Sequence, residues 1–329
     1  MDENRSFQQR WQGYCRRFGP IMEPAFKNDM PSRLKLLDAL DFISSRQLNK
    51  AVDCLQEIRE KAVNDDDTAA WSFFIGFCFE LAGQREHMMH CYIASASFGH
   101  SFYMPYLKMA IAEHAEADFA AAREDYLSAM SCLGQMSAEE MDNQALLRAW
   151  TGLVSCLTMM HRYSEAEEIM KQGDEKHPRM APAAAVLYAA LGNRQKAEDF
   201  LRSIEKLDAE QAKITAELTS RILDGSHPHF HPQQIENQSL LDFWACFEEN
   251  SKELKSMEET ELAEKLSEQL SKIYPFMGRP VQLRAESSEE KTKVFLKDCY
   301  AIGLQQGFGK LLNMRPKSLD GEWSFAIEH

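Results

Sequence analysis

The feature that most constrains the fold is a run of amphipathic segments over residues 32–208, which are separated by very short breaks. Apolar residues recur in these segments at the three- and four-residue spacing of a helix face. Small residues recur as well, from Gly76 to Ala110 and from Ala166 to Ala197, at a period of roughly 30–35 residues. A period of this length is typical of stacked helix pairs, in which each repeat packs against its neighbours.

Strand signals are nearly absent from the chain. There is no sustained alternating run rich in Val, Ile and Thr, and no Asn-Gly or Asp-Gly hairpin between such runs. With 15 Gly and 11 Pro among 329 residues, helix breakers fall below their average usage of roughly 7 and 5 per cent. Short breaks between helices favour antiparallel neighbours. The sequence therefore predicts an all-α fold, an α-solenoid of antiparallel helix pairs.

The clearest repeat unit spans residues 148–178. Its pattern is carried by Trp150, Leu153, Tyr163, Ala166 and Pro178. This unit resembles a tetratricopeptide repeat, although Val154 stands where that family prefers a small residue. Four further units, at residues 33–58, 71–97, 106–130 and 181–208, follow the same pattern. The Gly99-His100 pair after the second of these resembles the related Sel1-type repeat, so a hybrid of the two repeat types is an alternative.

The resemblance implies a right-handed superhelix in which the first helices of successive repeats line a concave groove for a peptide or a partner's helix. The matching positions of this chain give a candidate lining with an apolar centre and a more polar far end: Phe73, Phe77, Glu80, Met104, Leu107, Ile111, His114, Arg148, Thr151, Ser155 and Thr158. Family members that clamp a terminal carboxylate use Lys and Asn at several of these positions. An apolar or amphipathic partner segment is expected here instead.

Four regions are expected along the chain. Residues 1–31 form an N-terminal helix and linker, residues 32–208 hold about five repeats, and residues 209–275 form a degenerate helical extension. Residues 276–329 combine an irregular segment with a last helix, predicted over residues 287–314, that carries Val294, Ile302, Phe308 and Leu312. Because a solenoid exposes apolar ends, both terminal helices are expected to act as caps. The alternative is that one of them occupies the groove until a partner displaces it.

The motifs of common enzymes are missing from the sequence. It has no Gly-rich phosphate loop followed by Lys, no H-E-x-x-H, no G-x-S-x-G and no dinucleotide fingerprint. His227, His229 and His231 alternate in a way that presents three imidazoles to one metal if the segment is extended, but Pro228 and Pro232 favour a solvated loop. We therefore expect no enzyme, no metal and no cofactor, with this loop as the first place to look if that expectation fails.

Charge and cysteine usage bear on partners and location. The 37 basic and 51 acidic side chains give a net charge of −14, which disfavours attraction to nucleic acid or to anionic lipid. The eight cysteines are scattered singly, as is usual in a reducing compartment. With no signal peptide and no membrane span in the sequence, a cytoplasmic location is expected.

The sequence thus favours a protein-interaction scaffold or adaptor. A secretion-type chaperone and a peptide-sensing regulator are the alternatives within binding proteins, and an enzyme with a helical metal site is the third class. The oligomeric state is left open.

Overall fold

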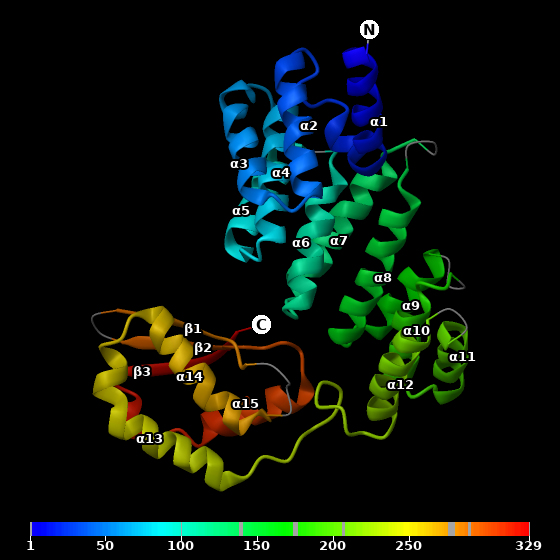
Figure 1. The fold of residues 1–329 in the computed structure, drawn as a ribbon. Helices are drawn as coiled ribbons and strands as arrows, with labels where there is room; N and C mark the ends of the chain where they lie inside the picture. Colours follow the sequence, from blue (N-terminus) through cyan, green and yellow to red (C-terminus); the bar gives the residue numbers. More distant parts are fainter. Residues whose placement is uncertain are drawn as a thin grey trace. The chain divides into compact units, whose positions relative to one another are not determined.

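The computed structural model describes residues 2–99, 101–137, 141–173, 177–205, 208–275, 280–288 and 291–328. The chain divides into two compact units, residues 1–153 and residues 154–329, and the boundary falls within one helix (Figure 1). Over the described residues the fold is helical, as predicted, with one small sheet near the C-terminal end.

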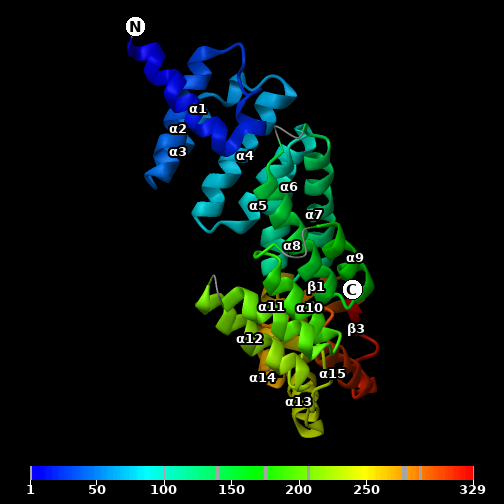
Figure 2. The same ribbon diagram turned by 90° about the vertical axis from the view of Figure 1, so that its right-hand side faces the viewer.

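The first unit contains a long N-terminal helix followed by three helix hairpins. Its elements are α1 (Asp2–Met22), α2 (Met30–Ser44), α3 (Leu48–Glu57), the short 3-10 helix η1 (Arg59–Lys61), α4 (Asp65–Leu81), α5 (Arg85–Phe98), α6 (Tyr103–Ala115), α7 (Phe119–Gly134) and the beginning of α8 (Asn143–Met159). Helices α2 and α3, α4 and α5, and α6 and α7 lie side by side as pairs (Figures 1 and 2).

The second unit continues the helix pairs and ends in a mixed domain. It holds the remainder of α8, then α9 (Tyr163–Gln172), α10 (Ala181–Ala190), α11 (Arg194–Glu205), α12 (Ala209–Leu223), α13 (Asn237–Lys255) and α14 (Glu259–Ile273). The strands β1 (Leu283–Ser287) and β2 (Thr292–Lys297) precede α15 (Ile302–Asn313), the 3-10 helix η3 (Lys317–Leu319) and β3 (Trp323–Glu328).

The same turn joins the two helices of each hairpin. One turn residue has a left-handed backbone, and the N–H of the next residue donates to the carbonyl five residues earlier. The left-handed residues are Arg46, Gly83, Ala117, His161 and Gly192, with φ between 58° and 73°. The hydrogen bonds run at 2.8–2.9 Å from Gln47, Gln84, Asp118, Arg162 and Asn193 to Phe42, Phe79, Glu113, Leu157 and Tyr188. Five hairpins are thus closed in one way.

Small residues allow neighbouring helices to approach closely, both within a hairpin and between hairpins. A Cβ atom added at Gly76 in α4 would lie 3.0 Å from Cys91 Cβ and from the Tyr92 ring of α5. At Gly152 in α8 the added atom would lie 2.1 Å from the ring of the buried Tyr126 in α7. The close packing of these helices depends on glycine at positions 76 and 152, because a protein interior leaves no room for the overlap that a larger side chain would cause.

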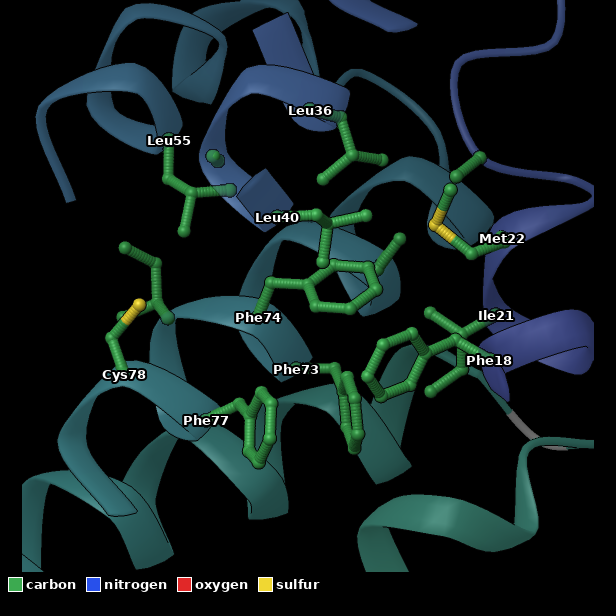
Figure 3. Packing of buried hydrophobic residues seen from close by; sticks show 14 of the residues in the cluster. Phe18, Ile21, Met22, Leu36, Leu40, Leu55, Phe73, Phe74, Phe77 and Cys78 are labelled. Atoms are coloured by element: carbon green, nitrogen blue, oxygen red, sulfur yellow. The ribbon is translucent and has the colours of Figure 1, made fainter. Parts of the chain in front are cut away.

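The core of the first unit is rich in aromatic side chains. Helix α1 breaks its helical backbone at Phe18 (φ −130°, ψ 26°), and the Phe18 ring packs edge-on against Phe73, Phe74 and Phe77 of α4 at 5.4–6.2 Å (Figure 3). Two other α1 side chains, Ile21 and Met22, are completely buried in the same cluster. The second half of α1 is therefore part of the core.

The C-terminal region differs from the sequence prediction. The helix expected over residues 287–314 begins only at Ile302, and residues 292–297 form β2. In β2 the side chains of Thr292, Val294 and Leu296 are buried while Lys293 is exposed, so the period is that of a strand. Val294 belongs to this strand, whereas Ile302, Phe308 and Leu312 lie on α15.

The sheet has the strand order β1-β2-β3. Strands β1 and β2 are antiparallel, while β2 and β3 are parallel and are connected through α15. One face of the sheet packs on α13, where the Trp244 ring contacts Phe325 at 5.1 Å and the Phe247 ring contacts Trp323 at 4.8 Å. The second partner strand of β2 is thus β3, which follows α15 in the sequence. In this pairing Thr292 lies opposite Trp323.

The recurring turn leads to a reciprocal stability prediction. At Ala117 a side chain occupies a left-handed position that favours glycine, so Ala117→Gly is expected to stabilise the first unit by roughly 0.5–1 kcal/mol. The matched change Gly83→Ala, at the equivalent turn of the preceding hairpin, is expected to destabilise by a similar amount. Thermal unfolding followed by circular dichroism measures both, and a fall in the melting temperature of Ala117→Gly would contradict the role assigned to the turn.

Candidate partner-binding surface

The candidate site is the face that the first helices α4 and α6 of two adjacent hairpins present together. At its centre Lys108 Nζ of α6 lies 2.8 Å from Glu80 Oε1 of α4, and both side chains are about 30% exposed (27% and 31%). Tyr92 of α5 donates to the other carboxylate oxygen of Glu80 at 2.5 Å. The Lys108 ammonium also lies 4.9 Å from the centre of the Phe77 ring. The ion pair therefore also contacts the Tyr92 hydroxyl and the Phe77 ring.

Apolar side chains flank this ion pair along α6. Met104, Lys108 and Ile111 follow one another at helical spacing on one stripe. Met104 is half-buried and Ile111 is 37% exposed, the lowest value among the exposed large apolar side chains of the described residues. We define the α4–α6 face as Glu80, Met104, Lys108 and Ile111. It combines adaptable apolar surface with a fixed pair of opposite charges.

The residues predicted to line the groove fall into two classes. Glu80, Met104, Ile111 and His114 on these two helices are partly or largely accessible, as are Arg148 and Thr151 on α8. The others are buried or lie elsewhere: Phe73 (0% exposed), Phe77 (7%) and Leu107 (6%) belong to the core, and Thr158 (1%) is buried in the second unit together with the half-buried Ser155.

The physical reason for the burial of Phe73 and Phe77 is the N-terminal helix. The Phe18 ring of α1 lies 6.2 Å from the Phe73 ring and 5.9 Å from the Phe77 ring. The same α1 segment buries Ile21 and Met22 completely, so its removal would expose several large apolar side chains. In this structure α1 covers part of α4, and the accessible portion of the predicted lining is shifted towards α6.

Sequence reasoning missed Lys108 and Tyr92. Lys108 follows Met104 by four residues and precedes Ile111 by three, so helical spacing alone places it on the same stripe. Its pairing with Glu80 of the preceding hairpin depends on how the two hairpins pack and carries no signal in the sequence. The contact of the Tyr92 hydroxyl with Glu80 likewise carries no signal in the sequence.

A half-buried pair of carboxyl groups, Glu113 of α6 and Asp125 of α7, links the two helices. Burial and the proximity of Asp125 raise the pKa of Glu113, and burial likewise raises the pKa of Asp125. The Oε2 atom of Glu113 is buried and has no hydrogen-bond partner among the described residues. Two carboxyl groups at such proximity favour the state in which at least one is protonated. Of the acidic side chains described in the first unit, this pair is the one most altered by its surroundings.

This pair predicts a pH dependence for the first unit. The folded-state pKa of Glu113 lies above its unfolded value of 4.5, so its contribution to stability is present in acid and is lost as pH rises. Glu113→Gln removes the charge, and we expect it to raise the melting temperature more at pH 9 than at pH 5. The exposed Glu86→Gln on α5 is the matched control. An equal effect of Glu113→Gln at both pH values would refute this assignment.

The histidine-rich loop is engaged by backbone carbonyls. His229 Nε2 lies 2.5 Å from the Met159 carbonyl oxygen, and His231 Nε2 lies 2.8 Å from the Ile222 carbonyl oxygen. His227 Nδ1 accepts a hydrogen bond from the His229 N–H at 3.3 Å. The imidazoles of His229 and His231 thus contact different helix ends. Because Pro228, His229 and Phe230 are buried, the expectation of a solvated loop is wrong for these residues.

The loop also anchors the start of α15. The N–H groups of Ile302 and Gly303 donate to the carbonyls of His229 and Pro228 at 2.9 and 3.0 Å. A Cβ atom at Gly303 would lie 2.8 Å from the Pro228 oxygen, so only glycine permits this approach. The role of His229 and its neighbours is therefore to connect the helical repeats of the second unit to its C-terminal domain.

Acid is expected to weaken this connection through His227. Burial, with smaller effects of the Arg221 and His231 charges, lowers the pKa of His227 to about 4. Folding favours the neutral imidazole. Its contribution to the free energy of unfolding is therefore complete above pH 6.5 and is lost as the pH falls towards about 4. His227→Asn keeps an acceptor for the His229 N–H without a titrating group. The melting temperature of this variant should fall less between pH 7 and pH 5 than that of the parent protein; parallel curves would contradict the role of His227.

Metal-binding and membrane-spanning features are both missing from the described residues. No group of three or more His, Cys, Asp or Glu side chains there is arranged to hold a metal ion. In the same residues no helix combines the length and the apolar character needed to cross a bilayer.

No protein-family model and no curated protein matches this sequence. Among solved structures, that of MamA AMB-1 is similar to this chain at 12% sequence identity, over 55% of this chain and 93% of that chain, with a TM-score of 0.42.

Proposed function

We propose that this protein is a protein-interaction scaffold whose α4–α6 face binds an apolar or amphipathic segment of a partner protein. The observation that carries this proposal is the accessible stripe of Met104 and Ile111 beside the Glu80–Lys108 ion pair. A partner helix or peptide would cover the two apolar side chains, while the ion pair would set its orientation.

The chemistry of the face suits binding better than catalysis. The Glu80 carboxylate is already shared between Lys108 and the Tyr92 hydroxyl, so the groups that could act as acid or base are paired with each other. Met104 supplies an unbranched side chain that adapts to different shapes. The net charge of −14 supports a protein partner over nucleic acid or anionic lipid. The eight cysteines are all thiols, which supports a reducing compartment such as the cytoplasm.

The proposal is tested with one charged substitution on the face and one matched substitution away from it. Ile111→Glu places a carboxylate on the accessible stripe and is expected to abolish retention of the partner or to weaken it at least roughly tenfold. Ile93→Glu makes the same change on α5, where Ile93 is 51% exposed, and should have no effect. Phe77 and Leu107 are unsuitable because both are buried, and a charge there would unfold the unit.

The readout is affinity capture from the native host, followed by measured binding of the identified protein to each purified variant. Circular dichroism establishes that both variants keep the helical fold. A partner that binds the parent protein and Ile93→Glu but not Ile111→Glu supports the proposal. If the partner binds both variants equally, the α4–α6 face is not its site.

A further inference from the structure

A second surface of the first unit, distinct from the α4–α6 face, has a different chemistry. A hollow of about 1240 Å³ lies between the loop that joins α1 to α2, the segment that leads into α4, and the join of α5 to α6. These segments contribute Glu23, Pro24 and residues 26–29, then Lys61 and residues 63–67, and Phe98 with Ser101, and Gln135 after α7 also lines the hollow. The hollow is formed entirely by residues of one unit.

Two large apolar side chains that line this hollow are exposed to solvent. Val63 is 83% exposed, the highest value among the large apolar residues described as exposed, and Phe98 is 43% exposed. Neither is needed to cover the aromatic core, whose Phe26 at the same hollow is already 1% exposed. Exposed apolar side chains gathered in a concavity and rimmed by polar groups are a mark of binding surfaces.

The rim of the hollow is predominantly acidic. Glu23, Asp29, Asp65 and Asp66 supply four carboxylates against the two ammonium groups of Lys27 and Lys61. The Asp29 carboxylate caps α2, where it accepts from the N–H and the hydroxyl of Ser32. Glu23, Asp65 and Asp66 are exposed, and none of the three forms an ion pair within the described residues. A fifth carboxylate, that of Asp67, is buried and serves the fold, because it accepts from the Phe26 N–H and the Asn64 side chain.

Helix stabilisation explains only part of this pattern. Asp65 and Asp66 lie in the first turn of α4, where carboxylates favour the positive end of the helix dipole. That effect accounts for neither Glu23, which follows α1, nor the exposure of Val63, which directly precedes α4, and of Phe98 at the end of α5. The combination of acidic and exposed apolar side chains suits a ligand of complementary character.

We infer that this hollow docks a basic segment of another protein, in which a large apolar side chain is flanked by Lys or Arg residues. The apolar side chain would contact Phe98 and Val63, and the flanking cations would pair with Asp65, Asp66 and Glu23. Charge complementarity favours association and sets the register, while the buried apolar contact supplies affinity that salt does not screen. This surface and the α4–α6 face would allow the protein to hold two segments at once.

The inference is tested with the full-length protein and a labelled synthetic peptide, Gly-Lys-Arg-Lys-Phe-Lys-Arg-Lys-Gly, by fluorescence anisotropy at low and high salt. Two peptide controls separate the contributions: one replaces Phe by Gly, and the other replaces every Lys and Arg by Glu. The parent protein is expected to bind the first peptide at least roughly tenfold more tightly than either control. Equal binding of the Phe and Gly peptides would show that charge alone is recognised and would overturn the inference.

Matched variants locate the site. Asp65→Asn combined with Asp66→Asn, and separately Phe98→Ser, should each weaken binding about tenfold. The control Glu210→Gln combined with Glu217→Gln removes two exposed carboxylates from α12, and Ile214→Ser removes a comparably exposed apolar side chain from the same helix. Both controls should bind like the parent protein. If the α12 carboxylate variant loses as much affinity as the α4 variant, binding follows net charge and the hollow is not the site.

Discussion

Five helix hairpins among the described residues each depend on one backbone hydrogen bond that closes the turn across a left-handed residue. The bond from Asp118 N–H to the Glu113 carbonyl, with Ala117 left-handed between them, has an equivalent in four other hairpins. Because the turn fixes where the second helix starts, it also fixes which side chains of the two helices meet. The close approach of α4 and α5 at Gly76 follows from this repeated geometry, whereas Gly152 of α8 meets Tyr126 of the preceding hairpin.

Much of this architecture could be predicted from the sequence, for reasons that particular residues make clear. Gly76 is small because Cys91 and Tyr92 leave no space for a side chain, and that constraint is visible as a repeat spacing. The turns are less visible, since three of the five left-handed positions are Arg46, Ala117 and His161 instead of glycine. Helix pairs can therefore be recognised from spacing, whereas their shared turn is recognised only in the structure.

The candidate site was predicted less completely, because tertiary contacts decide which groove residues are accessible. Phe77 has the right spacing for a groove, but Phe18 of the N-terminal helix, far away in the sequence, covers it. In β2, the alternation of Thr292, Val294 and Leu296 is only one short run among lysines, and its strand partner lies beyond α15. The histidine loop has the residue types of a metal site, and only the positions of the Met159 and Ile222 carbonyls show how its rings are used.

The parallel pairing of β2 with β3 also has a consequence for the order in which the chain acquires structure. Helix hairpins form from neighbouring residues and can be completed as soon as their second helix has been synthesised. Strand β2 has no partner on its β3 side until residues 298–322 and β3 itself have left the ribosome, and its Val294 and Leu296 are exposed for that interval. The helix hairpins can therefore fold before the sheet that contains β1, β2 and β3 is complete.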